Sequence, residues 1–164
     1  MGFGLAMFTL FHVALSLVGI FSGFVVVFGL LTAKQLKGWT ALFLATTVAT
    51  SVTGFLFPFH KFLPSHGVGI VSLIALAIAI FALYGRGLVG GWRRVYVVDA
   101  VISLYLNVFV LIAQMFMKVP ALKALAPTQS ETPFKVAQLA VLLLFVVLGI
   151  FAAKGFAREQ IRPA

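Results

Sequence analysis

Long apolar runs follow one another along the whole chain and are separated by short polar connections. Five such runs are present, and they cover Phe8–Leu31, Trp39–Phe57, Gly67–Tyr84, Val95–Met117 and Phe134–Ala153. A helix needs about 20 apolar residues to cross the hydrocarbon core of a bilayer, whereas the strands of a membrane β-barrel alternate apolar and polar residues. Because the runs are continuously apolar, we predict an all-α integral membrane protein, a bundle of five transmembrane helices.

The connections between the runs are too short for a separate soluble domain, so residues 1–164 are predicted to form a single transmembrane domain. The longest connection spans residues 118–133, and within it we predict a short interfacial helix over Val119–Ala126. Serine and threonine are preferred at helix N-termini. Ser65 is therefore expected to cap the third helix, and Thr132 the fifth.

The composition agrees with a membrane location and excludes several kinds of chemistry. Hydrophobic residues make up 63% of the chain and charged residues only 9%, compared with about 25% charged residues in soluble domains. The chain has no cysteine, which excludes disulfides and thiolate metal sites. A net charge of +9 would suggest nucleic acid binding in a soluble protein, but in a membrane protein it is first a signal of orientation.

The basic residues are divided unequally between the two sides of the predicted bundle, whose odd number of spans separates the termini. Four lysines belong to the N-terminal side: Lys61, Lys118, Lys123 and Lys135. Eight basic residues, including every arginine, belong to the C-terminal side: Lys34, Lys37, Arg86, Arg93, Arg94, Lys154, Arg158 and Arg162. Cytoplasmic loops carry an excess of Lys and Arg, so we predict the N-terminus outside and the C-terminus in the cytoplasm of a bacterial inner membrane. No nucleic acid partner is needed to explain the charge.

Small and polar residues indicate which helix faces pack against protein, because lipid is as apolar as the side chains themselves. In the first helix, His12, Ser16, Gly19 and Gly23 follow the spacing of one helical face. Gly19 and Gly23 form a GxxxG motif, which permits close approach of two helix backbones. His12 is therefore expected to face protein, and the two glycines to have a structural role.

The fourth helix carries a polar stripe along much of its length. Its members are Asp99, Ser103, Asn107 and Gln114. Charged residues within a membrane usually pair with one another, so Asp99 is expected to form an ion pair with Arg93 or Arg94.

All three histidines fall on the N-terminal side of the predicted bundle. Two imidazoles from different helices can ligate a b-type haem within a helical bundle. We predict that His12 and His66 are the axial ligands and that His60 is a substitute for either. Gln114 and Asn107 are predicted to make hydrogen bonds around the cofactor, the lysines on this side to pair with the haem propionates, and quinol to supply electrons.

The same residues permit other interpretations of this side of the membrane. The histidines would also be explained by ordinary interfacial hydrogen bonds. Together with the thioethers of Met7, Met115 and Met117 they suit Cu(I). A quinone whose head group is bound by a histidine and by Gln114 or Asn107 is a further hypothesis.

Two further function classes require no cofactor. The GxxxG face and the hydroxyl-rich second helix would provide contact surfaces for a non-enzymatic accessory or structural subunit of a larger membrane complex, or for a homo-oligomer. The polar stripe of the fourth helix would line the path of a small-solute transporter. The inverted repeats found in many transporters are not evident in the sequence.

Overall fold

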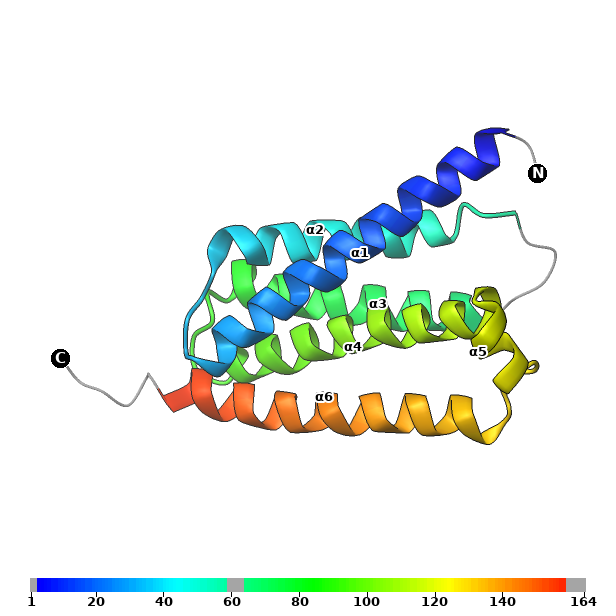
Figure 1. The fold of residues 1–164 in the computed structure, drawn as a ribbon. Coiled ribbons are helices and arrows are strands. Elements are labelled where there is room, and N and C mark those ends of the chain that lie inside the picture. Colours follow the sequence, from blue (N-terminus) through cyan, green and yellow to red (C-terminus); the bar gives the residue numbers. More distant parts are fainter. Residues whose placement is uncertain (1–2, 59–63, 159–164) are drawn as a thin grey trace.

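The computed structural model describes residues 3–58 and 64–158, and within these ranges it contains helices and connecting segments but no strand. The helices are α1 (Phe3–Leu31), α2 (Lys37–Gly54), α3 (Pro64–Ile80), α4 (Trp92–Lys118), α5 (Pro120–Leu125) and α6 (Thr132–Arg158) (Figure 1). A π-helical turn, η1 (Phe81–Gly85), continues α3. The predicted all-α class is confirmed for the described residues.

Each predicted apolar run corresponds to a long helix whose ends differ from the prediction by a few residues. The short helix predicted within Val119–Ala126 is present as α5. The expected role of Ser65 as an N-cap is wrong, because α3 begins at Pro64 and Ser65 lies within its first turn. Proline is favoured in that turn because its missing N–H would have no intrahelical partner there.

Four of the described helical segments are long and apolar enough to cross a membrane: α1, α3 together with η1, α4, and α6. Among the described helices, α2 does not reach the same hydropathy, because it contains Lys37 and several threonines and serines. The chain is thus a helical bundle in which four helices qualify as membrane spans by length and composition.

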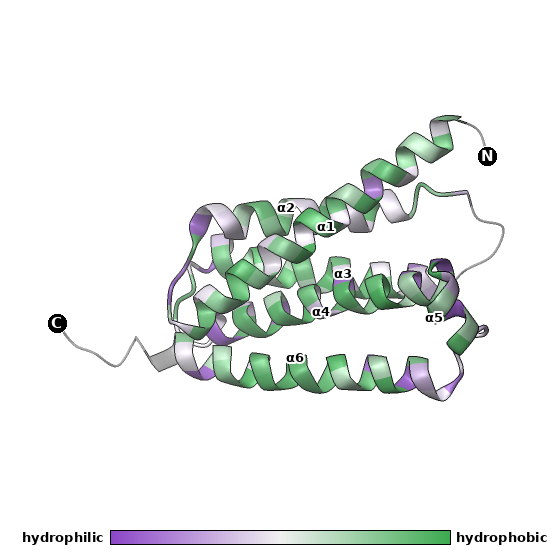
Figure 2. Cartoon of the chain, viewed as in Figure 1, coloured by the Kyte–Doolittle hydropathy of each residue, from purple (hydrophilic) through white to green (hydrophobic). Residues whose placement is uncertain are grey.

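Figure 1 shows α2, α3, α4 and α6 alongside one another, with α1 crossing them obliquely. α1 packs on α2, α4 and α6, and α4 packs on both α3 and α6. The first turn of α1 and the last turn of α6 lie at opposite ends of the bundle. Hydrophilic residues concentrate toward these ends, while apolar residues dominate the helices between them (Figure 2).

The two ends of the bundle differ in their side chains. The end at the last turn of α6 is called the basic end, and its described residues include Lys34, Lys37, Arg86, Arg93, Arg94 and Lys154. The opposite end is called the histidine end, and it contains His12, His66 and the α5 segment.

The apolar core lies in the half of the bundle next to the basic end. α1 contributes only its second half, because all its buried residues lie between Gly19 and Leu30. Large, fully buried side chains of the other helices belong to the same apolar cluster, among them Phe43, Leu76, Tyr96, Leu104 and Phe156. No described residue of α1 before Gly19 is buried. Close packing therefore holds the helices together mainly in the basic half.

Gly23 marks the tightest approach within this core. A Cβ atom at Gly23 would lie 2.6 Å from Leu104 Cδ1 and 2.8 Å from Phe43 Cε2. The other glycine of the motif, Gly19, is also buried, and a Cβ atom there would lie 3.2 Å from Thr47 Oγ1. Both glycines thus occupy positions where α1 approaches its neighbours closely, as the GxxxG spacing predicts.

α2 turns its polar side chains inward. Thr40, Thr46, Thr47 and Ser51 are buried, whereas Trp39, Leu42 and Val52 are exposed. Ser51 Oγ donates a hydrogen bond to Ser72 Oγ of α3 at 3.3 Å, and Asn107 Nδ2 of α4 donates to Thr47 Oγ1 at 3.2 Å. The hydroxyl groups of α2 therefore link it to its neighbours, and the helix presents apolar residues to the outside.

Candidate functional site

His12 lies in the first half of α1, and its half-buried imidazole contacts the C-terminal end of α2. Its Nδ1 is 2.8 Å from Thr53 Oγ1. Thr53 Oγ1 also lies within hydrogen-bonding distance of the carbonyl oxygens of Ala49, at 2.7 Å, and of Thr50, at 3.2 Å. When Thr53 donates to one of these carbonyls it accepts from His12, and the neutral imidazole then carries its proton on Nδ1.

This tautomer leaves Nε2 of His12 with the lone pair that a metal ion or a hydrogen-bond donor requires. Histidines that ligate metals usually donate their other ring N–H to a fixed acceptor, which sets the orientation of the ring. Phe57 meets the His12 ring edge-on, with centroids 5.1 Å apart and an interplanar angle of 86°. Phe8 lies against Phe57 at 4.8 Å. Thr53 and Phe57 thus orient the imidazole within an aromatic surround.

His66 occupies a different environment at the same end of the bundle. It lies in the first turn of α3, is buried, and packs against the ring of Phe55 with centroids 5.6 Å apart. Because Thr53 and Phe57 contact His12 while Phe55 contacts His66, the end of α2 separates the two imidazoles. The predicted alternative ligand, His60, lies outside the described residues.

Asn107 lies apart from His12 along the bundle. Asn107 donates a hydrogen bond to Thr47, and both side chains lie beside Gly19 of α1. Gly19 is about two helical turns along α1 from His12. Gln114 is partly buried further along α4. Within the described ranges, no group of three or more His, Cys, Asp or Glu side chains is placed to hold a metal ion. Asn107 thus lies at a different position along the bundle from His12.

The methionines of the copper hypothesis are surface residues. The side chains of Met7, Met115 and Met117 are 53%, 43% and 44% exposed, respectively. Of the three histidines in that hypothesis, His12 instead packs against Thr53 and Phe57.

Asp99 does not have the ion pair expected from the sequence. In the described part of the chain, no ion pair joins its carboxylate to Arg93 or Arg94. The guanidinium of Arg93 lies over the ring of Phe156 instead, with Cζ 4.2 Å from the ring centroid. A cation placed over an aromatic face is attracted by the negative potential of that face. Arg93 thus fastens α4 to α6 through an aromatic ring and not through a carboxylate.

The polar stripe of α4 runs beside apolar packing inside the bundle. Asn107 lies on the histidine side, whereas Leu104 and Phe43 meet over Gly23 and fill the interior next to it. Ser103 is fully buried, and its Oγ has no hydrogen-bond partner among the described residues. The stripe that suggested a polar path for transport therefore lies beside an apolar layer.

The connection between α5 and α6 is held to α4 and organised by a carboxylate. Gln129 Nε2 donates to the carbonyl oxygen of Ala113 at 2.6 Å. The carboxylate of Glu131 accepts hydrogen bonds from Thr128 Oγ1 at 2.8 Å, from the Thr128 amide at 3.1 Å and from the Ser130 amide at 3.1 Å. The bond from the Thr128 side chain, with those from the amides, lowers the pKa of Glu131 from its ordinary value. Ionised Glu131 therefore stabilises this connection.

Two glutamines at this end were not identified as structural residues from the sequence. Besides Gln129, Gln138 of α6 is buried and donates from Nε2 to the carbonyl oxygen of Phe109, at 3.1 Å. Its Oε1 is buried without a hydrogen-bond partner among the described residues. The sequence feature that could have identified Gln138 is that it is the single amide side chain within the apolar run Phe134–Ala153.

His12 is the described residue that best combines reactive chemistry with a defined orientation. Its Nδ1 is fixed by Thr53, its ring contacts Phe57, and it lies outside the closely packed half of the bundle. Comparison of the chain with protein-family models, with curated proteins and with solved structures gave no match. The function of the protein is therefore inferred from the geometry of its own residues.

Proposed function

We propose that the protein is a small integral membrane redox protein in which His12 ligates a planar, lipid-soluble cofactor, haem b in the first instance. The observation that carries this proposal is the bond from His12 Nδ1 to Thr53 Oγ1. With Nδ1 donating to Thr53, the lone pair lies on Nε2 and the ring is restrained, which is the arrangement that a ligand imidazole requires.

The surroundings of His12 suit a flat hydrophobic group with an anionic edge. Phe8 and Phe57 supply aromatic surface. Lys118, Lys123 and Lys135 belong to the same end of the bundle, where cations would pair with propionates. A bound haem would supply one-electron chemistry whose potential depends on its axial ligand. Quinol is the proposed electron donor.

The ligand set proposed here is narrower than the pair expected from the sequence. The end of α2 lies between His12 and His66, so both rings reaching one iron would require rearrangement of this segment. His12 is therefore the proposed protein ligand, and His66 is assigned to packing against Phe55.

We further propose that α2 is a fifth membrane-spanning helix. Its 18 residues would extend about 27 Å, close to the roughly 30 Å thickness of the hydrocarbon core. Its buried face is rich in hydroxyl groups, while Trp39, Leu42 and Val52 are exposed. An apolar outer face with a polar inner face is the reverse of a helix in water and suits a lipid surround. With five spans, the charge asymmetry orients the N-terminus outward and the basic end toward the cytoplasm of a bacterial inner membrane.

An absorption spectrum tests the cofactor proposal. Protein purified in detergent from cells supplied with haem should show a Soret band that shifts on reduction with dithionite. His12→Ala should lose the band and His66→Ala should retain it, with size-exclusion profiles checking that both variants remain folded. A colourless wild-type preparation would sink the haem proposal, and elemental analysis of the same sample would then test for copper.

A second candidate is a non-enzymatic accessory subunit of a membrane complex, favoured by the apolar exposed face of α6. The large exposed residues of this helix include Leu139, Leu143, Leu144, Val147 and Phe151. A colourless preparation that elutes with a stoichiometric membrane-protein partner would favour this candidate over the redox protein. A colourless preparation that elutes as a multiple of its own mass would favour a homo-oligomer.

A further inference from the structure

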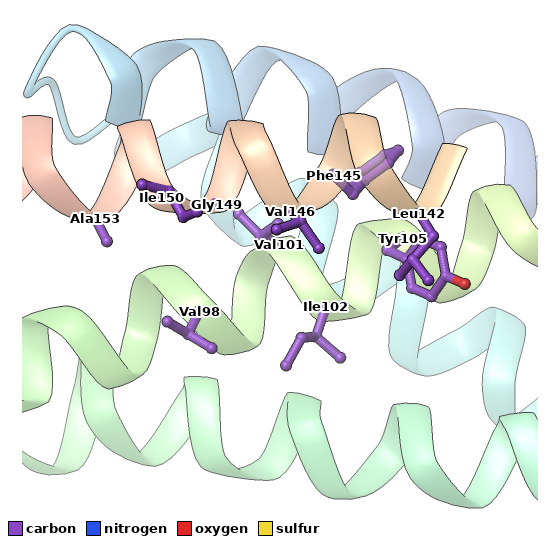
Figure 3. A pocket seen from close by; sticks show the side chains of 10 residues that line it. All are labelled: Val98, Val101, Ile102, Tyr105, Leu142, Phe145, Val146, Gly149, Ile150 and Ala153. Carbon is purple, nitrogen blue, oxygen red and sulfur yellow. The ribbon is translucent and has the colours of Figure 1, made fainter. Parts of the chain in front are cut away.

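An apolar groove lies between α4 and α6, away from the His12 contacts. Its volume is about 330 Å³, and its lining includes Val98, Ile102 and Tyr105 of α4 together with Val146, Gly149 and Ala153 of α6. Figure 3 shows these side chains converging from the two facing helices. Tyr105 supplies the only polar side-chain atom of the lining, so the groove offers a site for an apolar chain.

The groove covers about half the thickness of a bilayer. From Val98 to Tyr105 the helix rises about 10 Å, and from Arg94 to Tyr105 about 16 Å, at 1.5 Å per residue. Half of a hydrocarbon core of about 30 Å is about 15 Å. An apolar chain in the groove would therefore lie within one leaflet, the leaflet at the basic end, whereas a partner helix crossing the bilayer would need contacts over the full length of α4 and α6.

A positively charged side chain lies just beyond the groove, toward the basic end. Arg94 precedes Val98 by four residues and Ile102 by eight, so it lies on the same face of α4, one turn beyond the groove. Arg94 is exposed, and among the described residues its guanidinium has no ion pair or aromatic contact. Arg93 differs, because its guanidinium packs over Phe156. On the facing helix, exposed Lys154 follows Ala153 directly.

We propose that this groove binds an anionic phospholipid, with one acyl chain between α4 and α6 and the phosphate at Arg94. The apolar lining suits an acyl chain, and the length of the groove, about half a bilayer, confines that acyl chain to one leaflet. The unpaired guanidinium of Arg94 favours an anionic head group. Arginine forms charge-assisted hydrogen bonds with phosphate oxygens, often two at once. Basic sites between membrane helices on the cytoplasmic side are suited to such head groups. The site does not depend on the identity of any cofactor at His12.

Native mass spectrometry of the full chain, released from detergent containing equal amounts of phosphatidylglycerol and phosphatidylcholine, tests this proposal. We expect one retained phosphatidylglycerol per chain. Arg94→Gln should weaken its retention roughly fivefold, the ratio expected when one cation near a membrane surface is removed. Arg86→Gln is the matched control, because Arg86 is an exposed cation of the same end whose guanidinium lies over Trp92, 5.4 Å from the ring centroid.

A second variant tests the apolar part of the site. Gly149→Leu should reduce retention of both lipids, because a Cβ atom added at Gly149 would lie 3.4 Å from Val101 Cγ1 and the rest of the leucine side chain would occupy the groove. Equal retention of the two lipids by wild type would overturn the proposal, as would equal effects of Arg94→Gln and Arg86→Gln. A dimer that loses its association with Gly149→Leu and retains no lipid would assign the groove to a second copy of the chain instead.

Discussion

The two halves of α1 have opposite surroundings, although both consist mainly of apolar residues. Between Gly19 and Leu30 the helix packs closely against α2, α4 and α6, and eight of its residues are buried. Between Phe3 and Val18 none is buried, and the contacts of this half include those of His12 with Thr53 and of Phe8 with Phe57, just after α2. The comparison distinguishes a packed half of the bundle, around Gly19–Leu30 of α1, which holds the fold together, from an open half, around Phe3–Val18, which presents the oriented imidazole of His12.

The same division is visible in what each half buries. Near the basic end the buried side chains are mostly large and apolar, such as Phe43, Leu104 and Phe156. The hydroxyl groups of Ser22, Thr40 and Ser103 are also buried there. Toward the histidine end the buried side chains include an imidazole and an amide, and the buried polar residues include Thr47, Ser51, Ser72, His66 and Gln138. Polar groups inside a membrane bundle are used for specific hydrogen bonds or for function, because lipid provides them no partner. The histidine half is therefore where specific chemistry is expected.

The largest loss of stability is predicted for removal of an aromatic ring from the packed half. Phe43→Ala should destabilise the bundle by about 3–5 kcal/mol, because it removes a fully buried ring and leaves a cavity. Phe8→Ala, in the open half, should cost far less, since Phe8 is only partly buried. Unfolding in mixed micelles titrated with a denaturing detergent measures both. Equal costs would contradict the division into a packed and an open half.

A smaller effect is predicted for overpacking of the same region. Gly23→Val should cost about 1–3 kcal/mol, because its Cβ atom would lie within 3 Å of atoms of Leu104 and Phe43. Gly4→Val is the control in the open half, where a Cβ atom has no neighbour within 4 Å. The same titration measures both variants. A control as destabilising as Gly23→Val would show that helix propensity, and not packing, is responsible.

A still smaller effect is predicted for the polar contact between α1 and α2. The coupling between His12 and Thr53 should be about 0.6 kcal/mol, the average for side-chain hydrogen bonds measured between membrane helices. A double-mutant cycle with His12→Phe and Thr53→Val measures this coupling free energy. Strict additivity of the two substitutions would contradict the assigned hydrogen bond.

The smallest effect concerns the pH response of the connection between α5 and α6. The pKa of Glu131 is lowered in the folded protein by the Thr128 side chain, so ionisation stabilises the folded connection above the ordinary value near 4.5. That stabilisation should be lost as the pH falls through the lower folded pKa. Amide exchange at Thr128 and Ser130, corrected for intrinsic rates, should then accelerate. In Glu131→Gln the acceleration should be absent, and persistence of the full response would assign it to another group.

Much of the fold was predictable from the sequence because membrane helices are marked by long apolar runs. The runs beginning at Phe8, Gly67, Val95 and Phe134 became helices, and the short helix before Ala126 was also predicted correctly. The division of α1 into two halves was not predictable. Its whole run is apolar, and in lipid both core and surface positions accept apolar residues, so periodicity carries little information about burial.

The candidate site was predictable in residue type but not in geometry. His12 was expected to face protein, and its bond to Thr53 places it there. His12 and His66 are separated because Thr53 and Phe57 contact one imidazole and Phe55 contacts the other. The path of the chain at the end of α2 sets these contacts, and the spacing of residues in the sequence does not specify that path. The missing Asp99 ion pair has a similar cause, since Phe156 competes for Arg93 only once α6 packs on α4.

The most direct test of the account is a titration of haem into purified, cofactor-free protein. Wild type should saturate at one haem per chain, and His12→Ala should bind at least tenfold more weakly while its unfolding free energy changes little. Ser16→Ala is the control, because Ser16 lies one turn away on the same face and bonds only the carbonyl oxygen of His12. Equal haem affinity in wild type and His12→Ala, or no binding by either, would contradict a ligand site at His12.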